Sequence, residues 1–213
     1  MKTHKKVAVI GGTGKSGRYL VNTLLHCNYN IKMLVRNPER AISHNAIETV
    51  VGTVQDYKAV VQCLQSCDAV ISTLGLGIPP SAPDIFTIAT SHILKAMAET
   101  GSNRYIVTTG LNVDTPFDAK GGASKAATEW MYNNYPVSTK NQQQEYELLT
   151  KSNSDWTMVR LPIIQLVDEN PDIAVSLEDC PGTAIAAPAL ARFLIHQMHD
   201  SSYSKQAPFI ANK

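Results

Sequence analysis

The sequence predicts a single α/β domain with a Rossmann-like fold, a doubly wound parallel sheet with helices on both faces. Two observations predict this class. Short apolar runs typical of buried strands alternate with segments whose apolar residues recur at helical spacing. The first strand, 7–10, is followed by glycines at 11, 12, 14 and 17 and then by a helical segment. With 213 residues, the chain is long enough for one domain, 1–213, with a sizeable core.

The apolar pattern places each element in turn. Strands are predicted at 7–10, 31–35, 47–51, 104–110 and 155–162, and at 68–75 together with its exit loop. Shorter strands are predicted at 173–175 and 208–211. Helices are predicted after the glycines and around 60–64, 85–97, 123–133, 139–151 and 187–194. The pattern loosens over about 112–136 and 163–186, so these stretches are predicted to form a small substrate-side region.

The glycine-rich turn predicts a phosphate-binding loop. Its residues Gly12-Thr13-Gly14-Lys15-Ser16-Gly17 match the pattern G-x-G-x-x-G between a strand and a helix. Gly12 is expected to allow the tight turn, Gly14 to let a pyrophosphate approach the backbone, and Gly17 to let the helix pack closely on the strand. The free N–H groups at the helix start would then face the phosphates. A Walker A loop is disfavoured because Val9 stands where that motif needs a glycine.

The end of the second strand predicts which dinucleotide binds. An NAD-preferring site carries an acidic residue near this point, which bonds the ribose 2′-hydroxyl. Here the strand runs into Arg36, and Arg40 follows closely. Arginine can pair with a 2′-phosphate and stack on adenine, so the sequence predicts NADP(H) in preference to NAD(H). The alternative is that Arg36 is a solvated charge at the strand end.

Composition and charge limit the kinds of molecule that the protein is expected to bind. A net charge of +1 gives no general attraction to nucleic acid or to an anionic membrane. No apolar run approaches the ~20 residues of a spanning helix, and the first six residues lead into a strand rather than a signal-peptide core. The four cysteines and six histidines are dispersed, which disfavours a metal site. We therefore expect a cytoplasmic protein, monomer or homodimer, that binds a small molecule and no metal.

Four segments together resemble one family. They are 11–17, 34–38, 68–75 and 154–160, the last reading Ser-Asp-Trp-Thr-Met-Val-Arg after a predicted helix. Their order and spacing resemble the atypical short-chain dehydrogenase/reductases with an NAD(P)H-binding, NmrA-like domain. The smaller members of that family include biliverdin-IXβ/flavin reductases and NADH–flavin reductase homologues. The resemblance covers roughly residues 5 to 200 and implies a Rossmann fold with bound NADP(H).

The resemblance also implies roles for individual residues. The pyrophosphate loop would be Gly11 to Gly17, and Arg36 would grip the 2′-phosphate. The loop passing the ribose and nicotinamide would comprise Thr73, Leu74 and Gly75. The nicotinamide would be bordered by Thr108 and Thr109 at the end of strand five, and by Pro162 and Ile163 after strand six.

Two departures from the family pattern affect these roles. The family often has Gly-Asp after strand three, where the aspartate helps to hold the adenine. This chain has Gly52-Thr53 there, so Thr53 and Val54 are the residues expected beside the adenine. Several members carry serine at the end of strand five, and only Thr109 could take that role here.

The tyrosines bear on the chemistry. Many short-chain reductases use a tyrosine whose phenolate is stabilised by a lysine four residues later on the same helix face. No tyrosine of this chain has lysine at that spacing; Tyr135 and Tyr146 have Lys140 and Lys151 five residues on. The pair is therefore expected to be absent unless Tyr135 lies in non-helical backbone. Thr109 and Lys140 remain as weak candidates for a catalytic role.

Two functions follow from these observations. The first is an NADPH-dependent oxidoreductase that transfers hydride to a flavin, a quinone or a similar conjugated acceptor. Such an acceptor delocalises charge and takes its proton from solvent, so it needs no protein acid. The second is a non-catalytic NADP(H)-binding redox sensor or regulatory protein of NmrA-like type. An isomerase or a conventional carbonyl reductase is a further alternative.

Overall fold

The computed structural model describes residues 6–76 and 81–213. The main sheet contains the strands β1 (Lys6–Ile10), β2 (Asn30–Val35), β3 (Ile47–Val51), β4 (Ala69–Ser72), β5 (Arg104–Gly110), β6 (Asp155–Leu161), β8 (Ile173–Ser176) and β10 (Phe209–Asn212). The helices are α1 (Lys15–His26), α2 (Tyr57–Leu64), α3 (Ile85–Thr100), α4 (Gly122–Asn134), α5 (Pro136–Thr150) and α6 (Ala187–His196), with a 3-10 turn η1 (Pro38–Arg40). A separate two-stranded sheet pairs β7 (Ile163–Gln165) with β9 (Ala184–Ala186).

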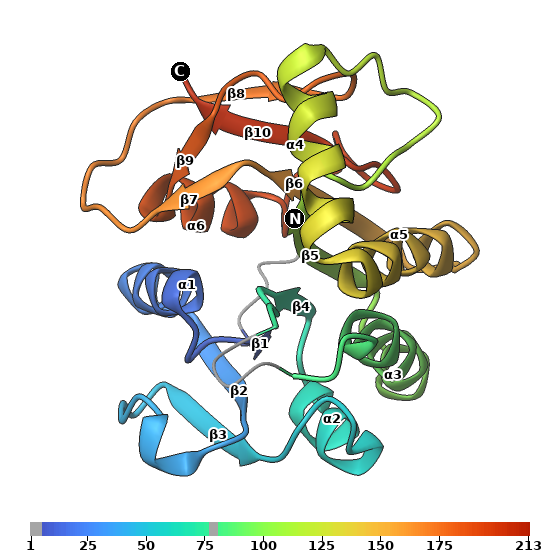
Figure 1. Ribbon diagram of the computed structural model, residues 1–213. Helices are drawn as coiled ribbons and strands as arrows, with labels where there is room; N and C mark the ends of the chain where they lie inside the picture. The colour runs from blue at the N-terminus through green and yellow to red at the C-terminus, as the bar shows by residue number, and fades with distance from the viewer. Residues whose placement is uncertain (1–5, 77–80) are drawn as a thin grey trace.

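The main sheet confirms the predicted fold class. Its strand order is β3-β2-β1-β4-β5-β6-β10-β8, and every pairing is parallel except that of β10 with β8 at the edge. Parallel neighbours need crossover connections, and the helices of the chain supply them. In Figure 1, α1 and α6 lie on one side of the sheet and α2, α3 and α5 on the other.

Two hydrophobic clusters bury the two faces of the sheet. Alternate residues of each strand point to opposite faces. Val7 and Val9 therefore pack with Leu20 and Leu24 of α1, whereas Ala8 lies in the other cluster with residues of α2, α3 and α5. Central strands buried on both faces read as continuous apolar runs, which is why they were predictable.

Three details differ from the expectation. The edge strand β8 runs antiparallel, and β7 and β9 pair within a stretch expected to be mostly loop. The helix expected at 139–151 begins at Pro136, because proline is well suited to the first helical position. Tyr135 then lies between α4 and α5 with φ −135° and ψ 52°, outside helical geometry.

The strand order marks where a ligand would bind. The chain leaves β1 towards β2 on one side and later returns to β4 on the other, so the carboxyl ends of β1 and β4 form the switch point of the sheet. Ligands of open parallel sheets bind in the crevice at that point. Among the described residues, no helix is long and apolar enough to cross a membrane.

Candidate functional site

A cavity of about 800 Å³ lies at the switch point. It is bordered by the glycine loop after β1 and by the segments that follow β2, β3 and β4. Twelve of the predicted site residues line it: Gly11, Thr13, Gly14, Lys15, Ser16, Arg36, Arg40, Thr53, Val54, Thr73, Leu74 and Gly75. The topology thus brings together residues that are more than 60 positions apart in the sequence.

The lining also contains residues that were not predicted. These are Ile10, Arg18, Leu34, Gly52, Gln55, Ser81, Ile85 and Leu166. A signal existed for Arg18, because it stands three residues after Lys15 and so shares a helix face with it. No comparable signal existed for Leu166, which follows β7 and reaches the cavity only through the fold.

The glycines of the loop have different physical roles. Gly12 was expected to allow the tight turn. In the structure Gly11 is the residue with a left-handed φ, of +81°, so the turn depends on Gly11 instead. A side chain on Gly12 would meet Met33, Val21 and Val9, and one on Gly17 would overlap the carbonyl oxygen of Gly11. Gly17 therefore lets α1 pack closely on the loop, as predicted. Gly12 and Gly17 do not line the cavity; their roles are in packing the loop against β2 and α1.

Gly14 faces the cavity and begins the helix. Its amide donates to the carbonyl of Gly11 at 2.9 Å, which closes the turn. As the N-cap of α1 it supplies no side-chain cap, and the first turn contains no acidic residue. The amides at the start of α1 thus lack a side-chain acceptor of the usual kind, which suits them to an anion.

The charges around the cavity have one sign. Lys15, Arg18, Arg36 and Arg40 line it, and no aspartate or glutamate is among the described lining residues. Arg36 Nη1 donates to Ser81 Oγ at 3.3 Å, which joins the end of β2 to the segment before α3. A dinucleotide phosphate fits these residues, because backbone amides and four cations converge where a glycine leaves room for it.

The other predicted residues lie beyond this lining. Thr108 Oγ1 donates to the carbonyl of Ser72 at 3.4 Å. Thr109 is 6% exposed, and its hydroxyl finds no hydrogen-bond partner in the described part of the chain. Pro162 and Ile163 follow β6, and Ile163 is 74% exposed. Lys140 lies on an exposed position of α5. These residues stay predictions for the nicotinamide and acceptor side.

The predicted substrate-side region is fixed to the sheet by a buried arginine. Arg160 on β6 is fully buried, and its Nη1 donates to both carboxylate oxygens of Asp118 at 2.7 and 2.9 Å. The same guanidinium donates to the carbonyls of Val113, Leu177 and Ala207. Residue 160, noted in the sequence as part of a family motif, therefore holds the loop between β5 and α4.

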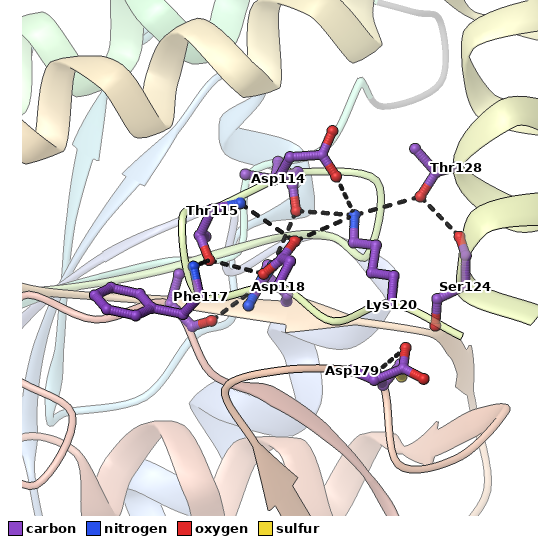
Figure 2. Close-up of polar contacts among 12 residues, drawn as sticks. Asp114, Thr115, Phe117, Asp118, Lys120, Ser124, Thr128 and Asp179 are labelled. Carbon is purple, nitrogen blue, oxygen red and sulfur yellow. Dashed lines mark hydrogen bonds and ion pairs between the residues drawn. The ribbon is translucent and has the colours of Figure 1, made fainter. Parts of the chain in front are cut away.

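Lys120 adds to the Arg160–Asp118 pair, and we call these three residues the clamp. Its Nζ donates to Asp114 at 2.6 Å and to the carbonyl of Val113 at 3.2 Å, and lies 3.7 Å from Asp118. Figure 2 shows Lys120 between Asp114, Asp118 and Thr128, with Asp179 below the start of α4. Asp179 accepts from the amide of Gly121 at 2.9 Å. The loop and the first turn of α4 are thus held by ionic and backbone contacts.

A buried carboxyl group lies between α5 and α3, outside the cavity lining. Glu145 on α5 is 2% exposed and accepts from Thr90 Oγ1 at 2.6 Å, and Thr90 bonds the hydroxyl of Tyr105 at 3.1 Å. The second carboxyl oxygen of Glu145 has no partner among the described residues. Burial raises the pKa of Glu145 to about 8, against a smaller opposing effect of the Thr90 hydrogen bond.

Glu145 is therefore expected to make stability fall as pH rises. The unfolded carboxyl titrates near ~4.3, so between that pH and about 8 the folded state holds the extra proton. The free energy of unfolding should then decrease with pH by up to about 1.4 kcal/mol per unit. In Glu145→Gln this decline should be absent, and in Glu147→Gln, an exposed neighbour on α5, it should persist. Urea unfolding at pH 5, 6, 7 and 8 measures it; parallel curves for wild type and Glu145→Gln would contradict the expectation.

A family model described as NAD(P)H-binding matches residues 11–201. The chain belongs to this NAD(P)H-binding family. The resemblance predicted from the sequence is confirmed. Binding of NAD(P)H explains why one cleft combines a glycine loop with several cations.

Solved structures with the same fold span nearly the whole chain. A short-chain dehydrogenase/reductase from Veillonella parvula in complex with NADP is 18% identical with a TM-score of 0.77, and the match covers 99% of this chain and 95% of that one. ChuY, an anaerobilin reductase from Escherichia coli O157:H7, is 16% identical with a TM-score of 0.79, and 97% of each chain is covered. At these identities the likeness concerns the fold.

One curated relative is similar over a shorter stretch. Phenylcoumaran benzylic ether reductase 1 from Arabidopsis thaliana is 29% identical over an alignment of 85 residues, and the match covers 35% of this chain. The match spans only 28% of the length of that relative. Family, fold and relatives together identify an NAD(P)H-binding protein related to reductases.

Proposed function

We propose that this protein is an NADPH-dependent reductase that transfers hydride to a flavin, a quinone or a similar conjugated acceptor. The observation that carries the proposal is the cleft at the switch point, which combines a phosphate-binding loop with four cations and has no carboxylate among its described lining residues. The family membership and the reductase relatives support the same class of reaction.

Different residues of the cleft would bind different parts of the cofactor. The amides of Thr13 to Ser16 and Lys15 would hold the pyrophosphate, and Arg36 and Arg40 the 2′-phosphate. When bound, the reduced nicotinamide supplies the hydride, and the protein orients its ring against the acceptor. The adenine would lie beside Thr53 and Val54, which line the cavity.

The proposed class of acceptor depends on the lack of a tyrosine–lysine pair that could donate a proton to the product. No tyrosine has a lysine four residues later. Tyr135 does lie in non-helical backbone, where spacing alone does not exclude Lys140, but no hydrogen bond joins Tyr135 to a lysine among the described residues. In the structure the ring of Tyr135 packs against Trp130 with centroids 5.8 Å apart, and that of Tyr146 packs against Trp156 with centroids 6.0 Å apart. An acceptor that delocalises the transferred electrons and is protonated by water needs no such pair. This favours conjugated acceptors over simple ketones.

An absorbance assay tests the proposal. Purified protein is mixed with NADPH and, in separate reactions, FMN, a soluble quinone, a linear tetrapyrrole and a simple ketone, and NADPH oxidation is followed at 340 nm. Turnover with a conjugated acceptor but not with the ketone is expected. Tyr135→Phe and Tyr146→Phe should retain most of that turnover, whereas loss of a general acid costs ~10²–10⁴-fold. Turnover with the ketone alone would contradict the proposal.

A second candidate is a non-catalytic NADP(H) sensor. It is favoured by the buried hydroxyl of Thr109, which is 6% exposed and so has little access to a substrate. Tight NADPH binding without turnover of any acceptor would support it. For either function we propose that the protein is a cytoplasmic monomer or homodimer. We also propose that it has no nucleic-acid or membrane partner, since a net charge of only +1 gives no general attraction to either.

The cofactor preference gives a separate prediction for Arg36. Its guanidinium is exposed and bonded only to the neutral hydroxyl of Ser81 among the described residues, so it is free to pair with a 2′-phosphate. Arg36→Ala should weaken NADPH binding by about 1.5–3 kcal/mol, as expected for a hydrogen bond to a charged group, and leave NADH binding almost unchanged. Fluorescence titration with both cofactors measures this. Equal losses would show that Arg36 does not read the 2′-phosphate.

A further inference from the structure

The arginines of this chain fall into two groups. Outside the cleft, Arg104, Arg160 and Arg192 each donate to a backbone carbonyl, and the first two also to a carboxylate. Inside the cleft, Arg36 bonds the Ser81 hydroxyl and no other side chain among the described residues. The side chains of Arg18 and Arg40 have no hydrogen bond or ion pair with any described residue. Among residues 6–76 and 81–213, three arginines of one cavity are therefore left without an acceptor of opposite charge.

This arrangement is unfavourable for the protein alone. Like charges that share a concave surface repel one another, and no carboxylate among the described lining residues offsets them. Arg18 also stands in the first turns of α1, near the positive end of the helix dipole, where a cation is disfavoured. An anion in the cavity would relieve both effects.

The position of Arg18 indicates which phosphate it would meet. Lys15 and the amides of the glycine loop stand at the very start of α1, where the pyrophosphate is expected. Arg18 lies one turn further along α1, and the same cavity joins it to Arg36 and Arg40 at the end of β2. Residues at that strand end distinguish a ribose 2′-hydroxyl from a 2′-phosphate.

We propose that Arg18 is a third arginine of the 2′-phosphate site and a determinant of NADPH specificity. The proposal rests on the NADPH preference put forward above and adds a residue to it. The 2′-phosphate carries a charge of about −1.5 to −2 at pH 7, which NADH lacks, and the Arg18 guanidinium on α1 would add a third cation to those of Arg36 and Arg40 in the same cavity. Three charge-assisted contacts then converge on the group that separates the two cofactors.

Binding measurements on matched variants test the role of Arg18. Dissociation constants for NADPH and NADH are measured by fluorescence titration for the wild type, Arg18→Ala, Arg36→Ala and Lys15→Ala. Lys151→Ala, at the exposed C-cap of α5, is the control outside the cleft. Adenosine 2′,5′-bisphosphate, which has a 2′-phosphate and no pyrophosphate, serves as the probe of the 2′-phosphate site.

Arg18→Ala should weaken NADPH and the bisphosphate on the order of tenfold and change NADH less than about twofold. Lys15→Ala should weaken NADPH and NADH alike. The Arg18 side chain is exposed and has no hydrogen bond or ion pair with a described residue, and its charge is unfavourable at this helix start. The thermal midpoint of Arg18→Ala without ligand should therefore stay the same or rise slightly. Equal losses of NADPH and NADH in Arg18→Ala, or no loss of either, would overturn the proposal.

The outcomes also separate this inference from the function on which it rests. If the wild type binds NADPH and NADH equally, the proposed cofactor preference is wrong, and the role of Arg18 is wrong with it. If the wild type prefers NADPH and Arg36→Ala removes that preference while Arg18→Ala keeps it, only the role of Arg18 is wrong.

Discussion

Gly14→Val is expected to abolish NADPH binding while the protein still folds. The backbone at Gly14 has φ −73° and ψ 172°, a conformation that valine adopts without strain. The nearest atom to an added Cβ is the carbonyl oxygen of Gly11, at 3.1 Å, so the loop must give by only a few tenths of an ångström. The rest of the side chain would lie where the phosphate has to approach.

The expected loss of affinity is at least about 100-fold, or about 2.7 kcal/mol. Fluorescence titration with NADPH measures it, and circular dichroism melting reports on the fold. Gly122→Val is the matched control, since a Cβ at Gly122 meets nothing within 4 Å and α4 lies outside the cavity. Near-normal NADPH affinity in folded Gly14→Val would show that the phosphate does not approach this residue.

Gly17→Ala should behave in the opposite way. Its Cβ would overlap the carbonyl oxygen of Gly11, so the helix and the loop would have to separate. This variant is expected to lose stability as well as binding. The pair distinguishes a glycine that the ligand requires from a glycine that the packing requires.

Asp118→Asn is expected to destabilise the fold by about 3–5 kcal/mol. Asp118 is the carboxylate that pairs with the fully buried guanidinium of Arg160, and its side chain is only 10% exposed. Removing its charge leaves two buried cations, Arg160 and Lys120, without their shared partner. A buried charge that loses its partner is costly because little water can reach it.

Urea unfolding at pH 7 measures the effect of this substitution. Asp114→Asn is the control: Asp114 also pairs with Lys120, but its side chain is 58% exposed, so a change of at most about 1 kcal/mol is expected. Similar destabilisation by the two variants would mean that burial does not govern this cluster. A loss in Asp118→Asn that spares NADPH affinity would place the clamp on the substrate side only.

Local patterns in the sequence were sufficient for the fold class and for much of the cleft. Strands buried on both faces, such as β1 and β4, appear as unbroken apolar runs. The glycine loop is contiguous, and Arg36 follows directly from the end of β2. The carboxyl ends of parallel strands meet at one edge of the sheet, so residues at several strand ends could be assigned to one site before the structure was known.

Tertiary structure decided what depends on contacts between distant segments. Gly11 rather than Gly12 has positive φ, and an added Cβ at Gly11 would meet the backbone of Thr73, 62 positions along the chain. The antiparallel β8 and the small β7–β9 sheet rely on pairing, for which short edge strands carry little periodic signal. The partners of Arg160, the depth of Glu145 and the convergence of Arg18 with Arg36 are equally long-range. The sequence by itself determined which elements form and where a dinucleotide would bind, because those signals are local and periodic; only the packing of the elements decided which charges are buried, paired or left facing the cleft.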